Sequence, residues 1–296
     1  MLGYGSSHRG SAADHAANGI ALLAAMATLF GLSAWVIGGV QGLGLALVAL
    51  AGTLAVAAGL PPAGVMRLHR GVPIGPADAP ELYALAAGLA RQAGLDTIPT
   101  LYWLPQRRAN AVAVGSSAEA VIGVSDGLMR TLSPREVAGV LGHEIAHLAA
   151  GDIDWLRLSA AITQLTRLIC TIGIVACVLL LLGGVATVPL WTVLFLAGAP
   201  TGMVLLQLGF SRAREFAADH MAAELTGDPA ALASALRRIH GLDASPWGFV
   251  NRLQPMAPTW LSTHPDPRER IERLLALSTP RPTAGIRPLA GPWGRR

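Results

Sequence analysis

Two long apolar stretches, residues 15–66 and 168–211, contain no Asp, Glu, Lys or Arg. A membrane span needs roughly 20 apolar residues, so each stretch can hold two spans and a tight turn. Glycine and proline punctuate both stretches near their centres, at 38–42 and 183–189. We predict spans near residues 17–37, 43–60, 168–187 and 189–209. The alternative is that these helices form the core of a large soluble protein.

Arginines at the ends of both stretches predict how the spans are oriented. The two turns carry no charge, whereas the other ends of the spans do. By the positive-inside rule, both termini and the middle segment are expected in the cytoplasm, with the chain a multi-pass protein of the cell (inner) membrane. The flanking residues are Arg9, Arg67, Arg70, Arg157, Arg167, Arg212 and Arg214.

Between the apolar stretches, the pattern changes to that of a small α+β domain. Residues 80–92 are predicted to form a helix, because Gly94 provides a stop just beyond them. Residues 100–104 read as a strand, and 111–114 and 120–124 read as a hairpin joined by Gly115-Ser116-Ser117. We also expect the run 119–124 to be an edge strand that pairs with the backbone of a substrate.

A strong helix start follows at Ser133-Pro134, with Glu136 three residues after the cap. This helix is predicted to run from Arg135 to about Ala150 and to end at Gly151. Further helices are expected at 211–225, from 228 to 241, and from 266 to about 277, with a long loop at 242–263.

These elements predict an α-rich integral membrane protein with about four transmembrane helices and an α+β domain in two parts, with a small β-sheet. The expected division is a tail and first hairpin (1–66), the first part of a cytoplasmic domain (67–167), a second hairpin (168–210), the second part (211–278) and a disordered tail (279–296).

Composition supports a membrane location. Apolar residues make up 52% of the chain and charged residues 14%, against about 25% charged in soluble domains. The net charge of +4 suits contact with anionic lipid headgroups. No basic run is interleaved with aromatic residues, so nucleic acid is not an expected partner.

The predicted helix at 135–150 carries His143-Glu144-Ile145-Ala146-His147, an H-E-x-x-H segment. Residues i and i+4 share a helix face, so both imidazoles can reach one metal ion. Glu144 lies about 100° round the helix, where it can take a proton from a metal-bound water. The pattern predicts a metallopeptidase. The alternative is a pair of surface histidines on an amphipathic helix.

A catalytic zinc ion needs a third protein ligand and an open position for water. Glu215 and Asp219 are four residues apart on a predicted helix that follows the fourth span. We assign Glu215 as the ligand and expect Asp219 to accept a hydrogen bond from a zinc histidine. From spacing alone, an ordinary charged helix face that pairs with Arg212 and Arg214 remains open.

The order of these motifs resembles that of the HtpX-like membrane metallopeptidases, and more distantly the CAAX prenyl proteases of eukaryotes. The resemblance rests on H-E-I-A-H followed, after two apolar spans, by S-R-A-R-E-F-A-A-D, and covers roughly residues 100–275. It implies a zincin-like catalytic domain, one Zn²⁺ per chain, Glu215 as third ligand and Asp219 behind the ligands.

Three further residues take roles from this resemblance. Asn110 stands where the family has Asn-Ala-Phe, although Val112 replaces the phenylalanine, and it is expected to help hold the substrate or the oxyanion. His264 and Arg270 match the family's late His-Pro and Arg, which implies that they stabilise the developing negative charge. Without the resemblance, Asn110 reads as a turn residue and His264 as a loop residue before a capped helix.

The sequence therefore predicts a membrane-embedded zinc metalloendopeptidase that cleaves polypeptides, including damaged or unassembled membrane proteins. A non-proteolytic metal-binding scaffold or chaperone is the alternative, and it would require a closed four-ligand site. A transporter is disfavoured, because no charged residue falls within a predicted span. The oligomeric state is not predicted.

Overall fold

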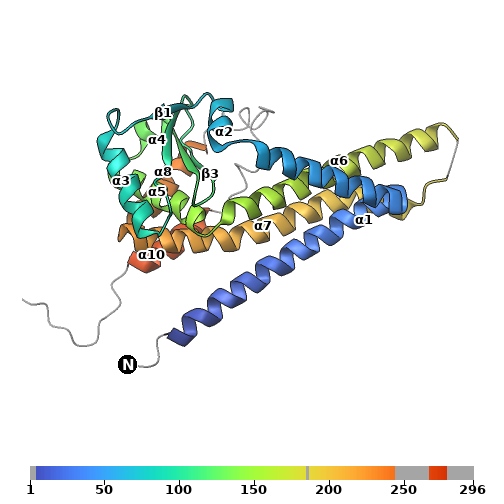
Figure 1. Cartoon of the computed structure of the whole chain (residues 1–296). Coiled ribbons are helices and arrows are strands. Elements are labelled where there is room, and N and C mark those ends of the chain that lie inside the picture. The colour runs from blue at the N-terminus through green and yellow to red at the C-terminus, as the bar shows by residue number, and fades with distance from the viewer. Residues whose placement is uncertain (1–4, 185–186, 244–266, 279–296) are drawn as a thin grey trace, which may run out of the picture.

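A computed structural model describes residues 5–184, 187–243 and 267–278 of the chain. Long helices lie side by side and extend away from a compact domain that contains the sheet and the shorter helices (Figure 1). The membrane-protein fold class expected from the sequence is confirmed, since three helices are long and apolar enough to cross a bilayer.

The first long helix, α1 (Gly5–Gly59), folds back on itself at Gly39. Gly39 has φ 57° and ψ −142°, a backbone conformation that favours glycine, and it lies in the predicted turn at 38–42. A Cβ atom at Gly42 would lie 2.4 Å from the carbonyl oxygen of Ala34, so the returning half packs closely on the first. Two of the four predicted passes are therefore halves of one bent helix.

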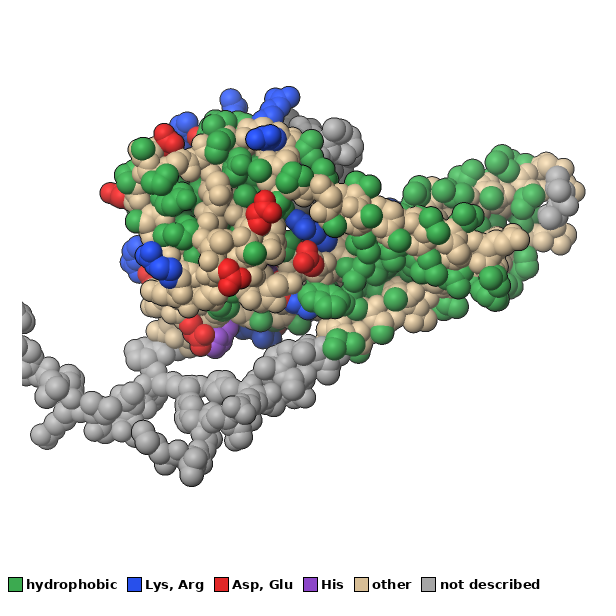
Figure 2. Space-filling view, in the orientation of Figure 1, with side chains coloured by type: hydrophobic (Ala, Val, Ile, Leu, Met, Phe, Trp, Pro, Cys, Tyr) green, Lys and Arg blue, Asp and Glu red, His purple; other side chains and the backbone are tan. Residues whose placement is uncertain are grey.

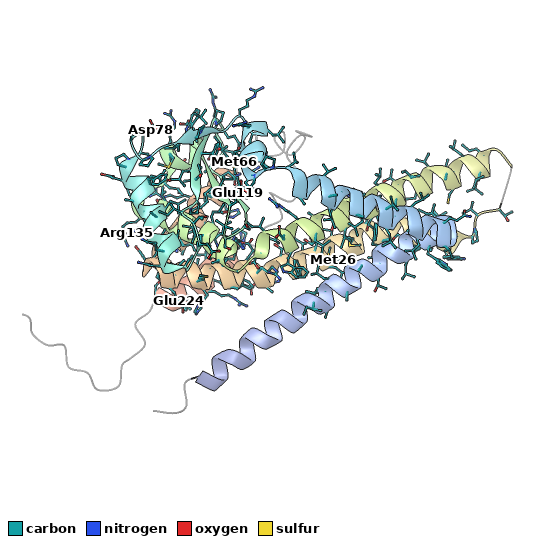
Figure 3. The ribbon with its side chains drawn as sticks, viewed as in Figure 1. Met26, Met66, Asp78, Glu119, Arg135 and Glu224 are labelled. Carbon is teal, nitrogen blue, oxygen red and sulfur yellow. The ribbon has the colours of Figure 1, made fainter. Side chains whose placement is uncertain are left out.

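The other two long helices are α6 (Asp152–Leu182) and α7 (Leu190–Thr226), which pack against each other and against α1. Met26 of α1 is fully buried in this bundle and lies near α7 in Figure 3. In contrast, Leu182 is 81% exposed, and hydrophobic side chains cover much of the outer surface of the long helices (Figure 2). Such an outer face is suited to lipid.

The compact domain is built on a four-stranded sheet in the order β1-β2-β4-β3. Its strands are β1 (Val72–Ile74), β2 (Thr100–Leu104), β3 (Ala111–Gly115) and β4 (Ala120–Ser125). The predicted hairpin is confirmed, because β3 and β4 pair antiparallel. The predicted edge strand was wrong: β4 is also paired, in parallel, with β2, so the edge strands are β3 and β1.

One side of the sheet is covered by the helix that carries the H-E-x-x-H segment, α5 (Pro134–Ala149). The predicted capping box is present, and the Ser133 backbone N–H donates to Glu136 Oε2 at 2.8 Å. Leu141 and Ile145 of α5 lie in the main hydrophobic core. The remaining helices are α2 (Pro62–Leu68), α3 (Pro80–Gln92), α4 (Asp126–Thr131), α8 (Pro229–Asp243) and α10 (Pro267–Ser278).

Two glycines let α5 approach its helical neighbours closely. A Cβ atom at Gly139 would lie 3.0 Å from the backbone of Leu232 in α8. A Cβ atom at Gly142 would lie 3.1 Å from the Thr226 methyl group at the end of α7. The close approach at Gly142 brings α5 against α7, so side chains far apart in the sequence meet between these two helices.

Candidate metal centre

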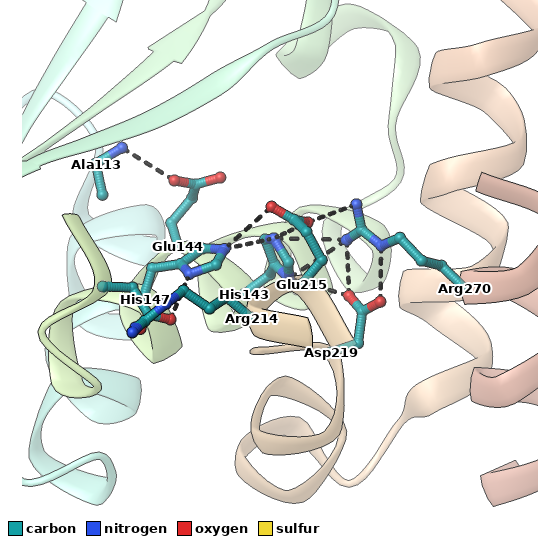
Figure 4. A network of polar contacts seen from close by, with 9 residues as sticks. Ala113, His143, Glu144, His147, Arg214, Glu215, Asp219 and Arg270 are labelled. Atoms are coloured by element: carbon teal, nitrogen blue, oxygen red, sulfur yellow. Dashed lines mark hydrogen bonds and ion pairs between the residues drawn. The ribbon is translucent and has the colours of Figure 1, made fainter. Parts of the chain in front are cut away.

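Three potential metal ligands converge between α5 and α7 (Figure 4). The Nε2 atoms of His143 and His147 are 3.2 Å apart. The Glu215 carboxylate oxygens lie 3.3 Å from His143 Nε2 and 3.5 Å from His147 Nε2. All three ligand atoms lie within 4.8 Å of one another, and all three residues are buried. This is the ligand set expected from the sequence.

The helices explain why these three side chains meet. His143 and His147 are one turn apart on α5, so their side chains project from the same face. Glu215 belongs to α7, which runs without a break from Leu190 past the apolar stretch and into the domain. Pro200 lies inside this helix and does not end it. The carboxylate is thus carried to the imidazoles by a helix that begins in the apolar hairpin.

A carboxylate lies behind each imidazole. Asp219 Oδ1 is 3.0 Å from His143 Nδ1, in the position expected from the sequence. Asp152 Oδ2 is 3.1 Å from His147 Nδ1, a contact that the sequence analysis missed. A carboxylate at Nδ1 holds the proton there, which leaves Nε2 with a lone pair for a metal ion. Both imidazoles are therefore oriented toward a common point.

Arg270 of α10 closes the other side of this cluster. Its guanidinium donates two hydrogen bonds of 2.7 Å to Asp219 and lies 2.8 Å from Glu215 Oε2. The side chain is almost fully buried, and its Nη2 is 3.4 Å from His143 Nδ1. Arg270 therefore contacts a predicted ligand and a residue that orients another ligand, which ties α10 to the site.

The charges of the cluster favour a cation. Four carboxylates, those of Glu144, Glu215, Asp219 and Asp152, lie in or beside the site. Two guanidinium groups accompany them: Arg270, and Arg214, which donates a hydrogen bond to Asp152. With both imidazoles neutral, two negative charges are left over. A divalent cation would balance them in surroundings where an unpaired charge is unfavourable.

The pKa values of the two histidines reflect the same field. Burial and the nearby Arg270 lower the pKa of His143, but hydrogen bonds to Asp219 and Glu215 outweigh both and raise it above the ordinary value. Burial likewise lowers the pKa of His147, and Glu215 and Glu144 raise it overall. The carboxylates thus stabilise positive charge at the position of the imidazole nitrogens.

Glu144 lies beside the ligands rather than among them. Its side chain is partly exposed, and its Oε2 accepts a hydrogen bond of 2.9 Å from the backbone N–H of Ala113. Ala113 belongs to β3, so this N–H points away from β4 and toward the free edge of the sheet. The carboxylate is placed between the metal ligands and β3.

The remaining predicted residues have different outcomes. Asn110 directly precedes β3, and its backbone N–H and C=O are both bonded to Ser125, at 2.8 and 3.0 Å. His264 lies outside the described residues. Asp152 and Arg214 were not predicted for this site; the only sequence signal for Asp152 was its position one residue after Gly151, at the end of the motif helix.

The donor atoms fit a zinc-type ion. Two imidazole nitrogens and one carboxylate oxygen are typical of catalytic zinc sites, whereas Mg²⁺ and Ca²⁺ prefer sets of oxygen ligands. Within the described parts of the chain, these residues form the single cluster of three or more such ligands. Three protein ligands leave a coordination position for water.

Comparisons with known proteins agree with this geometry. The model of peptidase family M48 matches residues 76–278. The chain is 38% identical over 218 residues to a protease HtpX homolog from Acaryochloris marina, a match covering 68% of this chain and 73% of that protein. It is 32% identical over 276 residues to a protease HtpX homolog from Methylibium petroleiphilum, covering 86% and 95%.

Among solved structures, Ste24p from S. mikatae matches with a TM-score of 0.52 at 18% identity. The match covers 86% of this chain and 62% of Ste24p, and at this identity it shows a shared fold. The family model covers strands β2, β3 and β4, the H-E-x-x-H helix and the helix that carries Glu215. The chain therefore belongs to peptidase family M48 and is a membrane metallopeptidase related to the HtpX proteases.

Proposed function

We propose that the chain binds one zinc ion through His143, His147 and Glu215 and hydrolyses internal peptide bonds of polypeptides. The convergence of these three buried ligands carries the proposal, because a carboxylate lies behind each imidazole and a coordination position stays open. A structural zinc site would need a fourth protein ligand, so the three-ligand set favours catalysis over a scaffold.

In this proposal Glu144 is the general base. A bound zinc ion would polarise the substrate carbonyl and lower the pKa of a coordinated water. Glu144 takes a proton from the attacking water and passes it to the leaving amine. Its hydrogen bond with the Ala113 N–H keeps the carboxylate at the edge of the sheet, beside the peptide bond that is cleaved.

The substrate would bind in an extended form along β3. This strand is an edge of the sheet, so its outward C=O and N–H groups, apart from the Ala113 N–H that bonds to Glu144, can pair with a peptide backbone. Asn110 lies at the entrance to β3, where we propose that it helps to hold the substrate. Arg270 supplies positive charge within the site. For His264 we propose the role that the resemblance implies, which is to stabilise the oxyanion.

The substrates that fit best are membrane proteins. Glu215 lies five residues after Phe210 on one continuous helix, a rise of about 7–8 Å. Leu205, one and a half turns before Phe210, has an exposed side chain suited to lipid. A peptide bond just outside the bilayer would be within reach of the site, as in a damaged or unassembled membrane protein.

We further propose that the catalytic domain and both termini are cytoplasmic. The arginines at the domain ends of the long helices, and the absence of charge in the turns at 38–42 and 183–189, support this orientation. The catalytic unit would then comprise residues 67–167 and 211–278, interrupted by the hairpin at 168–210. Cysteines introduced into the turns should react with impermeant reagents from outside the cell.

The experiment that tests the proposal compares wild type with Glu144→Gln in purified full-length protein. Both proteins should contain one zinc ion per chain, because Glu144 is not a ligand. Cleavage of an unfolded membrane protein should fall by about 10²–10⁴-fold in the variant, the usual contribution of a general base.

Glu224→Gln is a matched control, because Glu224 is an exposed carboxylate on α7 that contacts His220 and no predicted ligand. It should keep both zinc and activity. Full activity of Glu144→Gln would contradict the proposed mechanism. Stoichiometric zinc without cleavage by wild type would favour the scaffold.

A further inference from the structure

The buried carboxylate of Asp152 connects the candidate metal centre to both helices of the second apolar hairpin. Its Oδ2 lies 3.1 Å from His147 Nδ1, and its Oδ1 accepts a hydrogen bond from Arg214. The Asp152 residue is 3% exposed. The Arg214 guanidinium in turn lies 4.8 Å from the centre of the Phe210 ring, which is fully buried.

The backbone explains how Asp152 reaches His147. The motif helix α5 ends at Ala149, and Gly151 adopts φ 67°, a conformation that side chains disfavour. The chain turns there, and Asp152 becomes the first residue of α6. Arg214 comes from α7, directly before the predicted ligand Glu215. The support of His147 is thus built from the start of one apolar helix and the end of the other.

We propose that Asp152 and Arg214 are positioning residues that hold His147 with its proton on Nδ1 and its Nε2 free for metal. The proposal rests on the zinc function above. Arg214 acts through Asp152, because it fixes the carboxylate oxygen that does not face the imidazole. As α6 and α7 supply these two residues, metal affinity depends on how the second hairpin packs.

The expected size of the effect follows from the contacts. Partners of this kind behind zinc histidines change metal affinity by about 10–100-fold. Asp152→Asn keeps the shape of the side chain but removes the charge that holds the proton on His147 Nδ1. Arg214→Gln leaves the carboxylate in place, so it should weaken zinc binding less. The double variant should bind zinc no more weakly than Asp152→Asn, because Arg214 acts through the same carboxylate.

Zinc affinity is measured by competition with a chelator on the full-length protein in detergent micelles. Asp154→Asn is the matched control, since Asp154 lies two residues away on α6, its side chain is 78% exposed, and it contacts Arg157. Asp152→Asn should lower the affinity about 10–100-fold, and Asp154→Asn should leave it unchanged. Equal affinities for the two variants would overturn the proposal.

A second measurement separates positioning from a general loss of structure. In metal-free protein labelled with ¹⁵N-histidine, measured at a pH above the raised pKa of His147 so that the ring is neutral, wild-type His147 should show one tautomer, with the proton on Nδ1. Asp152→Asn should give a mixture, while Asp154→Asn should match wild type. Weaker zinc binding with an unchanged tautomer would indicate a merely structural role and would overturn the proposal. Absence of zinc from wild type would instead contradict the proposed function, because the tautomer is read without metal.

Discussion

Replacing Arg270 by methionine should destabilise the metal-free protein strongly. The guanidinium makes two hydrogen bonds of 2.7 Å to Asp219 and an ion pair of 2.8 Å with Glu215, and it is 2% exposed. Methionine fills much of the same space but leaves two buried carboxylates without this cation. Removing one partner of a buried charge pair costs about 3–5 kcal/mol. We expect a loss of this size in the free energy of unfolding.

The assay is equilibrium unfolding of the full-length protein in detergent micelles, with chelator and with zinc. Arg273→Met is the matched control, because Arg273 is on the same helix and makes surface contacts with Glu269 and the Phe216 ring. Its loss should be about 1 kcal/mol or less. Zinc should reduce the deficit of Arg270→Met, because the ion brings positive charge to Glu215.

Two results would refute this reasoning about Arg270. If Arg270→Met were no less stable than Arg273→Met without metal, the buried network would not hold α10 against α7. If zinc left the difference between the variants unchanged, the ion would not share Glu215 with the guanidinium. Either result would show that contacts with the metal centre do not stabilise the packing of α10.

Four further changes test other parts of the structure. Glu215→Ala should lose zinc in metal analysis while remaining folded by circular dichroism. Ala113→Pro should lower kcat/KM at least about tenfold with little loss of stability, because this N–H donates to Glu144 and not to β4. Gly139→Val should lower the unfolding free energy by about 1–3 kcal/mol, since its side chain would meet the backbone of α8. Burial raises the pKa of Glu136, but hydrogen bonds from Ser234 and Ser133 outweigh burial and lower the pKa overall. The ionised carboxylate therefore stabilises the fold, so wild type should have a higher free energy of unfolding than Glu136→Gln at neutral pH. This difference should shrink as the pH falls below about 4.5, because the carboxylate becomes protonated.

Local signals predicted the motif helix well, because its ends are set by residues within one turn. Ser133 and Glu136 form the capping box that was read from the sequence, and Gly151 adopts the positive φ that ends the turn after α5. The shared helix face of Asp219 and Glu215 was predicted for a similar reason, since their spacing of four residues sets it. The spacing did not show that this face meets α5.

The sheet order could not be read in the same way. Residues 120–125 are buried along their whole length, so their pattern did not show which neighbours they have. Their second partner is β2, which runs parallel to β4 and is separated from it in the sequence by β3. The short strand β1 was not predicted from the sequence. Pairings of this kind depend on tertiary packing, which outweighs local propensity.

Asp152 was not predicted as a site residue, because the motif helix α5 ends before it and helical spacing no longer relates it to His147. The turn at Gly151 sets its direction, and only the meeting of α5, α6 and α7 shows that it faces His147. In the sequence, the apolar hairpin lies between the motif helix α5 and the ligand candidate Glu215. Since α7 continues without a break to Glu215, the rise of a helix fixes the height of the ligand above the apolar stretch. A metal site carried by separate loops would have no such fixed distance from the membrane.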